Sequence, residues 1–106
     1  MLKIVKVVIF SPVESASDVR KAIGEAGGGK IGNYDFCSFS TKGVGRFRPL
    51  KGSNPSIGNI DEITEVEEEK VEFVCERDRL QDVINEVKKV HPYEEVPIDI
   101  YPIELE

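Results

Sequence analysis

The chain has 106 residues, a formal net charge of −6 and 40% hydrophobic residues. This length suits one domain, and we expect a single domain over residues 1–106. The acidic balance argues against nucleic-acid binding, because nucleic-acid-binding proteins present positive surfaces. The longest apolar run covers residues 7–10, far short of the roughly 20 residues that cross a membrane. We therefore expect a protein that binds neither membranes nor nucleic acids.

The N-terminus and the cysteines indicate the cytoplasm. Lysines interrupt the first apolar residues, which leaves no signal-peptide core there. Cys37 and Cys75 stand far apart and form no CxxC pair. In a reducing compartment such cysteines stay reduced, so we expect free, buried thiols rather than a disulfide.

Residues 2–10 predict the first strand, because apolar residues alternate there and many are β-branched. Both faces of this strand carry apolar side chains. They are Val5, Val7 and Ile9 on one face, and Leu2, Ile4, Val8 and Phe10 on the other. We therefore expect both faces to be covered.

A helix is predicted next, and it ends at the glycines 27–29. Ser11 and Glu14 form a capping-box pattern with Pro12 in the first helical position, and glycine suits the left-handed residue that ends a helix. Residues 24–31 come close to a phosphate-binding pattern. However, Ile31 stands where that pattern needs a hydroxyl, and the glycines follow a helix instead of a strand. We therefore interpret the glycines as a helix end.

The middle of the chain predicts two strands joined by a long loop. Residues 31–41 and 63–75 have strand-like patterns, and the loop over 42–60 is rich in glycine and proline. The apolar phase slips within residues 63–75, which indicates a bulge or a projecting end near residues 67–69. We expect the acidic run 65–69 to be a solvated strand edge.

A second helix and a last strand complete the pattern. Asp78 and Gln81 form a second capping box, an apolar stripe follows, and Pro92 ends the helix. Residues 96–103 predict a strand whose prolines place it at a sheet edge. The order βαββαβ predicts an α+β, ferredoxin-like sandwich, which is a four-stranded antiparallel sheet with two helices on one face. The other sheet face would be bare and apolar, so we expect an oligomer packed through it.

The loop over 42–60 carries four cations and no acid, in a chain that is acidic overall. Arg46, Phe47, Arg48 and Lys51 are the candidate ligand-binding residues, because arginine forks suit phosphate or carboxylate groups. Loops on a rigid scaffold also often carry function. These residues predict a site for a small anion or a protein partner. The alternative is a solubilising loop, or one that packs on the acidic surface of a neighbouring subunit.

His91 is the only histidine of the chain, and Glu94 follows three residues later. This pair is the candidate metal site, and a divalent metal is the cofactor that it would hold. One histidine with local carboxylates is a thin set of ligands, since zinc sites use three or four protein ligands. Adjacent Glu94 and Glu95 would also point in opposite directions along an extended segment. The alternative is a rigid His-Pro joint that aims the last strand, with Tyr93 packed across an interface.

Three segments of the chain together resemble one known family. They are SPVESASDVRKAIGEAGGGKIGNYDFCSF, GVGRFRPLKGSNPSIG and HPYEEVPIDIYPI. In this order, from Pro12 to Ile103, they resemble the PII-like domain of the Nif-three (YqfO-type) family, and the last segment also resembles CutA, a more distant PII-like relative. The resemblance implies a ferredoxin-like fold and a homotrimer whose sheets line the interior. It also implies that residues 42–60 occupy the place of the ligand-contacting loop of PII proteins. The cation tolerance associated with CutA points again to His91 and Glu94.

These observations predict a non-catalytic, PII/CutA-like module that binds a small ligand, a metal or a partner and acts as a homo-oligomer. The ligand would sit between subunits, near Arg46, Arg48, His91 and Glu94. No catalytic residue is predicted, because no serine, cysteine or lysine has a recognisable base beside it. Two alternatives stay open: a metal-dependent hydrolase-type enzyme with His91 and Glu94 in its site, and a purely structural assembly module. In the larger Nif-three proteins the metals lie in flanking halves that this sequence does not contain, so their hydrolase label is not carried over.

Overall fold

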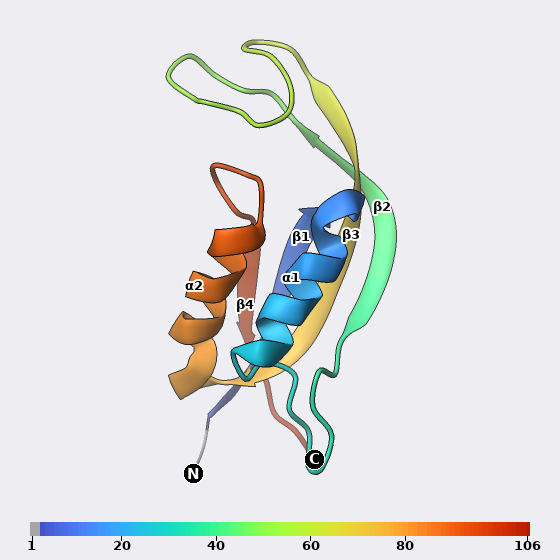
Figure 1. Ribbon diagram of the computed structural model, residues 1–106, viewed down its shortest axis with the longest axis vertical. Coiled ribbons are helices and arrows are strands. Elements are labelled where there is room, and N and C mark those ends of the chain that lie inside the picture. Colours follow the sequence, from blue (N-terminus) through green and yellow to red (C-terminus); the bar gives the residue numbers. More distant parts are fainter. Residues whose placement is uncertain (1–2) are drawn as a thin grey trace.

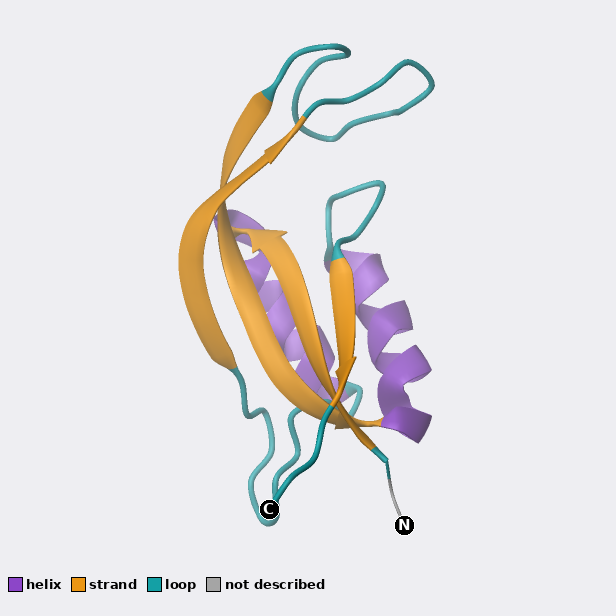
Figure 2. Cartoon of the chain, turned by 180° about the vertical axis from the view of Figure 1, so that it is seen from behind, coloured by secondary structure: helices purple, strands orange, loops and turns teal. Residues whose placement is uncertain are grey.

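The computed structural model describes residues 3–106. Its elements are β1 (Ile4–Pro12), α1 (Val13–Glu25), β2 (Phe39–Phe47), β3 (Thr64–Glu76), α2 (Leu80–Val90) and β4 (Ile98–Pro102), with a short 3-10 turn at Arg77–Arg79 before α2. Neighbouring strands are antiparallel, in the order β2-β3-β1-β4. Both helices cover one face of the sheet (Figure 1), and the opposite face is open (Figure 2). The predicted ferredoxin-like sandwich is confirmed. Within residues 3–106, no helix has the length and apolarity needed to cross a membrane.

The core lies between the sheet and the two helices. Its members alternate along β1 and β3 and recur at helical spacing along α1 and α2. They are Val5, Val7, Ile9, Val19, Ile23, Val71, Phe73, Cys75, Leu80, Val83 and Val87. Burying an aliphatic side chain of this size contributes roughly 1.5–3 kcal/mol, so the helix-covered face is the main source of stability. Both cysteines are free, as expected, with Cys75 buried in this core and Cys37 half-buried.

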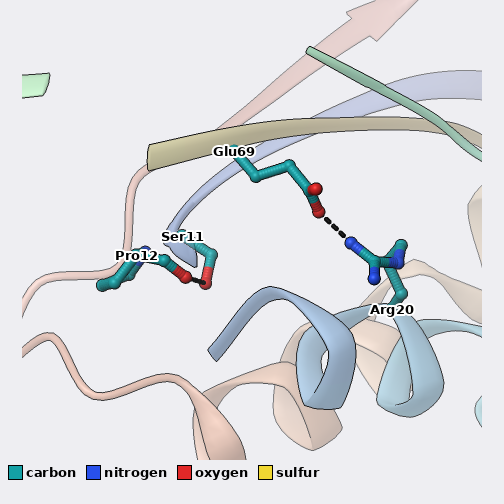
Figure 3. Close-up of polar contacts among 4 residues, drawn as sticks. All are labelled: Ser11, Pro12, Arg20 and Glu69. Carbon is teal, nitrogen blue, oxygen red and sulfur yellow. Dashed lines mark hydrogen bonds and ion pairs between the residues drawn. The ribbon is translucent and has the colours of Figure 1, made fainter. Parts of the chain in front are cut away.

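The predicted capping box at the start of α1 is not formed. β1 extends through Pro12, and α1 begins at Val13 without a side-chain cap. Ser11 is buried, and its Oγ donates to the Pro12 carbonyl oxygen at 3.0 Å (Figure 3). The reason is that Ser11 and Pro12 pair with Glu69 and Glu68 of β3, which keeps both residues extended.

The end of α1 is the glycine turn that the sequence predicted. Gly27 has a φ of 99°, a left-handed conformation that costs glycine little. The N–H groups of Gly27 and Gly28 donate to the carbonyl oxygens of Gly24, at 3.2 Å, and Ile23, at 2.9 Å. This pair of hydrogen bonds is the Schellman motif, so these glycines serve as a helix end.

The second strand lies further along the chain than predicted. Residues 31–38 form an irregular connection, and β2 begins only at Phe39. Pairing decides this, because every residue of β2 faces a residue of β3 in an uninterrupted register. The irregular part of the predicted loop over 42–60 therefore begins at residue 48, and Arg46 and Phe47 belong to the strand.

β3 runs without a bulge and projects beyond the rest of the sheet. Its pairing with β1 ends at Glu68, opposite Pro12, whereas its pairing with β2 continues to Thr64. Both registers are continuous, so the bulge is wrong and the projecting end is confirmed. The slip in apolar phase marks the point where β3 leaves the helix-covered core. We call the projecting part, residues 44–67, the arm; it forms the top of the molecule in Figure 1.

Only part of the acidic run 65–69 is the solvated strand edge that the sequence predicted. Glu65 and Glu67 are exposed, on the part of β3 that pairs with β2 alone, whereas Glu68 and Glu69 are buried where β3 lies between β2 and β1. Glu69 is 7% exposed and forms an ion pair with Arg20 of α1 (Figure 3). Glu68 is 9% exposed, and as the preceding residue of an extended strand it points to the opposite side. Alternation along the strand therefore gives the two carboxylates different surroundings.

α2 ends where the sequence predicted. His91, just after the helix, takes an extended conformation with φ −80° and ψ 130°, as expected for a residue before proline. The predicted capping box of Asp78 and Gln81 is not formed, because the chain enters α2 through the 3-10 turn and Gln81 donates to Asn85 one turn further on. β4 is an edge strand that pairs with β1, as its prolines predicted.

The open face of the sheet is more polar than the first strand alone predicted. Val8 and Phe10 lie on it, but Lys6 shares the face, and its Nζ lies 3.5 Å from Glu72 Oε1 of β3. Leu2, which was predicted to extend this face, lies outside the described residues. An oligomer packed through this face stays a prediction.

Candidate functional site

The arm and the segment that follows α2 meet beyond the end of β1. The loop of the arm passes over residues 91–97, which we call the His-Pro segment (Figures 1 and 2). A hydrogen bond joins the two, since the backbone N–H of Asn54 donates to Glu94 Oε2 at 2.9 Å. Residues 40 positions apart in the sequence therefore share one surface.

His91 holds the His-Pro segment against β1. Its Nε2 donates to the Phe10 carbonyl oxygen at 2.7 Å, and its Nδ1 accepts the Tyr93 N–H at 3.1 Å. Donation from one ring nitrogen and acceptance at the other require the neutral imidazole. Burial lowers the pKa of His91, and the hydrogen bond to Phe10 and the charge of Glu68 only partly oppose this effect. In this geometry the histidine is a neutral structural link.

Tyr93 connects this link to the arm. Its ring centroid lies 5.9 Å from that of Phe47, in an edge-to-face arrangement, and 4.9 Å from that of His91. Its hydroxyl donates to Glu68 Oε2 at 2.6 Å. Burial, followed by the bond to Glu68, raises the pKa of Tyr93, so the phenol keeps its proton. Tyr93 thus has packing partners within its own chain. Its predicted packing across an interface stays a prediction.

A cavity of about 380 Å³ lies between the arm and the His-Pro segment. One part of its wall is apolar and comes from β1, the arm and the His-Pro segment. These residues are Phe10, Phe47, Pro49, Pro55, Ile57 and Pro97. Polar and charged groups complete the lining, and they are Arg46, Ser53, Ser56, Glu68, Tyr93, Glu94 and Glu95, beside Gly45. The lining thus combines an apolar surface with one cation and three carboxylates.

Gly45 makes room for Glu68 in this wall. A methyl group at Gly45 would collide with Glu68 Oε1. Glycine inside a strand often marks such a close approach. A larger residue at this position would therefore displace the carboxylate from the cavity.

The structure brings some predicted site residues together and separates others. Arg46, Phe47 and Glu94 line the cavity. Arg48 and Lys51 are exposed and lie outside its lining. The predicted ligand-binding residues therefore divide between the end of β2, which reaches the cavity, and the loop beyond it.

Arg46 already has a partner. Its Nε donates to Glu65 Oε2 at 2.7 Å, across the β2–β3 pair. Both side chains are exposed, so this ion pair contributes less than about 1 kcal/mol to stability. It uses one of the five N–H groups that a guanidinium carries.

Glu68 is the residue that the sequence interpretation missed, because it sits in a run of acids typical of a solvated surface. One signal in the sequence pointed to it. Gly43 and Gly45 alternate along a strand, so both remove a side chain from the same face. At Gly45 the missing side chain leaves room for Glu68, whereas a methyl group at Gly43 would meet nothing within 4 Å.

The pairing of His91 with Glu94 in a metal site stays a prediction. A metal at either ring nitrogen of His91 would have to replace the hydrogen bond to Phe10 or to Tyr93. Among residues 3–106, no three histidine, cysteine, aspartate or glutamate side chains are placed to hold one ion. Zinc-type sites use three or four protein ligands, so the structure brings together fewer donors than such a site needs.

A larger and more open hollow, of about 1000 Å³, lies between α1 and α2. Its lining carries charges of both signs, and several of them pair along their own helix. Lys21 lies 3.9 Å from Glu25, and Lys89 lies 2.7 Å from Glu86. Such pairs are ordinary on solvated helix faces, so the smaller cavity is the better candidate site.

Comparison with known proteins shows that most of the chain is similar to one part of longer relatives. No protein-family model matches the chain. It is 46% identical over 99 residues to a Bacillus subtilis protein named "GTP cyclohydrolase 1 type 2 homolog", and 43% and 40% identical over 98 residues to proteins of the same name from Halalkalibacterium halodurans and Mycobacterium leprae. The matches cover 93%, 92% and 92% of this chain but 26% of each relative. The chain therefore spans about a quarter of the length of these relatives.

Solved structures give the same result. A Bacillus cereus protein related to NIF3 matches with a TM-score of 0.86 and 40% identity, over 99% of this chain and 27% of that one. CutA from Archaeoglobus fulgidus, described as a periplasmic divalent cation tolerance protein, matches with a TM-score of 0.69 and 21% identity, over 97% of this chain and 86% of that one. CutA1 from Oryza sativa matches with a TM-score of 0.69 and 14% identity, over 99% and 84% of the two chains. At these lower identities the CutA likeness establishes the fold alone. The predicted resemblance is confirmed: over nearly its whole length the chain is similar to one segment of longer NIF3-related proteins, and it has the ferredoxin-like fold that CutA shares.

Proposed function

We propose that this domain is a non-catalytic module that binds a small ligand in the cavity between the arm and the His-Pro segment. The observation that carries the proposal is the cavity itself. Its volume of about 380 Å³ falls in the range of about 300–1,000 Å³ that small-molecule sites occupy. An apolar wall with a few placed polar groups is also the usual composition of such sites. Arg46, Phe47 and Glu94, which the sequence proposed for binding, contribute to this wall.

The chemistry of the lining supports binding rather than catalysis. None of the residues that line the cavity is a histidine, a cysteine or a lysine. Ser53 Oγ donates to the Leu50 carbonyl oxygen at 2.7 Å, so its proton is directed away from any base. Tyr93 keeps its proton because its pKa is raised. Covalent catalysis requires a nucleophile that an adjacent base activates. In this lining the Tyr93 hydroxyl does donate to the Glu68 carboxylate, but the raised pKa of Tyr93 opposes transfer of its proton.

The name of the curated relatives does not assign an activity to this domain. It states homology to a GTP cyclohydrolase for proteins of which this chain spans 26%. The proposal therefore concerns the binding capacity of this domain alone.

We also propose that the domain associates with copies of itself through the open face of the sheet. Phe39 and Tyr101, on the two edge strands of that face, are 68% and 51% exposed. Aromatic side chains are enriched in protein interfaces. Light scattering at micromolar concentration tests this, and the expected result is the mass of a trimer. A folded monomer would refute the self-association.

Ligand binding is tested by screening a library of small metabolites against the isotope-labelled protein by NMR. The expected result is a set of compounds that shift amide resonances of the arm and of the His-Pro segment together. The variant Ser56→Trp places a large ring at the cavity wall and should abolish these shifts. Ser38→Trp, a change at another exposed loop serine outside the lining, is the matched control and should retain them. Equal binding by wild type and Ser56→Trp would place the ligand elsewhere and overturn the proposal.

A further inference from the structure

The charges around the cavity are unbalanced. Three carboxylates line it, those of Glu68, Glu94 and Glu95, and the single cation is Arg46. Arg46 already donates to Glu65, outside the lining. Within residues 3–106, the ion pairs of the structure use other carboxylates, so none of the three in the lining is neutralised by a lysine or arginine.

Glu68 is the carboxylate for which this imbalance matters most. It is 9% exposed, and burial of a charge is costly unless a partner compensates it. Its Oε2 accepts a hydrogen bond from Tyr93, whose phenol is neutral. Lys42 and Lys70 line an adjoining pocket with Glu68, but neither approaches within ion-pair distance of it. A positive group that enters the cavity would supply the missing charge.

The rest of the wall suits an organic cation better than a metal ion. Among residues 3–106, no three acidic, histidine or cysteine side chains are placed to hold one ion, and Glu94 Oε2 already accepts a hydrogen bond from Asn54. The carboxylates are therefore spread around an apolar hollow. Phe47 and Tyr93 add aromatic rings, which attract cations through their π faces. A ligand with an ammonium or guanidinium group on an apolar body would satisfy both parts of the wall.

We propose that the cavity selects a small organic cation, a primary amine or a guanidine on an apolar body, with Glu68 as its principal charge partner. This inference rests on the proposed function, because it names the class of ligand for the same cavity. It differs from the anion that the four cations of residues 42–60 predicted. The difference arises because Arg48 and Lys51 lie outside the lining, whereas the three carboxylates lie inside it.

Three probes of nearly equal shape test the sign of the charge. Tyramine is a cation, tyrosol is its neutral alcohol analogue, and 4-hydroxyphenylacetate is the anion. NMR titrations of the full chain should give a Kd for tyramine about tenfold lower than for tyrosol, the gain of one charge-assisted hydrogen bond, with 4-hydroxyphenylacetate weakest. If none of the probes shifts the cavity amides while other compounds of the library do, the inference alone fails, and if the library gives no shifts either, the proposed function fails with it. If the neutral or anionic probe binds as tightly as tyramine, ligand binding stands and the inference alone fails.

The variant Glu68→Gln then tests the residue. Glutamine keeps an acceptor for Tyr93 and removes the charge, so the tyramine Kd should rise about tenfold while the tyrosol Kd stays the same. Glu67→Gln removes the same charge from an exposed neighbour outside the lining, and it should leave both affinities unchanged. Glu94→Gln, at an exposed position, should raise the Kd for tyramine by about threefold. This second variant tests the inference even if Glu68→Gln folds poorly. If neither Glu68→Gln nor Glu94→Gln changes the Kd for tyramine, the inference is overturned.

Discussion

Glu69 and Glu68 are consecutive residues of β3 that point into two differently built regions. On the helix side, Glu69 meets the guanidinium of Arg20 on α1 (Figure 3). On the cavity side, Glu68 meets the neutral hydroxyl of Tyr93. The two carboxylates are buried to similar extents. Burial alone therefore does not distinguish a structural carboxylate from one that faces a cavity. The charge of the group that each carboxylate contacts does distinguish them.

The largest effect is expected from Arg20→Met, which keeps the aliphatic stem but leaves Glu69 buried without a cation. Breaking a buried ion pair destabilises by several kcal/mol. Because the Arg20 side chain is 38% exposed, we expect a loss of about 2 kcal/mol in the free energy of unfolding. Urea denaturation measures this loss. Lys21→Met, at an exposed position on the same helix, is the control, and equal stability of the two variants would contradict the prediction.

Glu68→Gln should change the free energy of unfolding by less than about 1 kcal/mol, in either direction. Glutamine retains an acceptor for the Tyr93 hydroxyl and removes a buried charge that has no cation. The same urea experiment applies. A loss as large as that of Arg20→Met would show that Glu68 is also a structural carboxylate, and the contrast between the two regions would disappear.

A pH change should affect the cavity side through His91. Burial lowers its pKa in the folded protein, so the unfolded chain binds a proton first as the pH falls through about 6.5. The free energy of unfolding should therefore be highest above this pH and decrease toward pH 5.5. His91→Gln should flatten this decrease, as seen in urea midpoints between pH 7.5 and 5.5.

Glu68 should modulate this pH dependence. Its charge raises the pKa of His91 and so opposes the effect of burial. Removing that charge in Glu68→Gln lowers the His91 pKa further, and the decrease in stability below pH 6.5 should become steeper. An unaltered slope in Glu68→Gln would mean that the two groups do not interact.

The smallest effect is expected from Arg46→Gln, which removes the ion pair between Arg46 of β2 and Glu65 of β3. Arg46 and Glu65 are both exposed, so water replaces the lost partner. We expect a change below about 0.5 kcal/mol in the free energy of unfolding. A loss above about 1 kcal/mol would show that the arm is held more tightly than an exposed pair allows.

The pattern of residues was enough to predict the fold, because helix and strand periods are properties of short segments. The alternation of β1 and the stripe of α2 each identified a buried face, and Pro92 ended α2 at the predicted place. The position of β2 could not be predicted in this way. Glycine has a low strand propensity, so residues 42–47 indicate a loop, but pairing with β3 makes them a strand.

The candidate site could be predicted only in part. Arg46, Phe47 and Glu94 were identified from charge, aromatic character and a local motif, and they do line one cavity. Glu68 was not identified, since nothing in an acidic run distinguishes one glutamate from the next. Its burial depends on the room that Gly45 leaves and on Tyr93, which lies 25 positions further along the chain.

The sequence by itself determined the order of the elements and the buried faces of β1, α1 and α2, because periodicity and helix ends act over a few residues. Only the tertiary structure decided which carboxylate meets a cation and which meets a cavity. That choice depends on α1 crossing β3 at Glu69, and on the arm folding over the His-Pro segment at Glu68. Electrostatic partners are set by contacts between distant segments, and no local pattern records them.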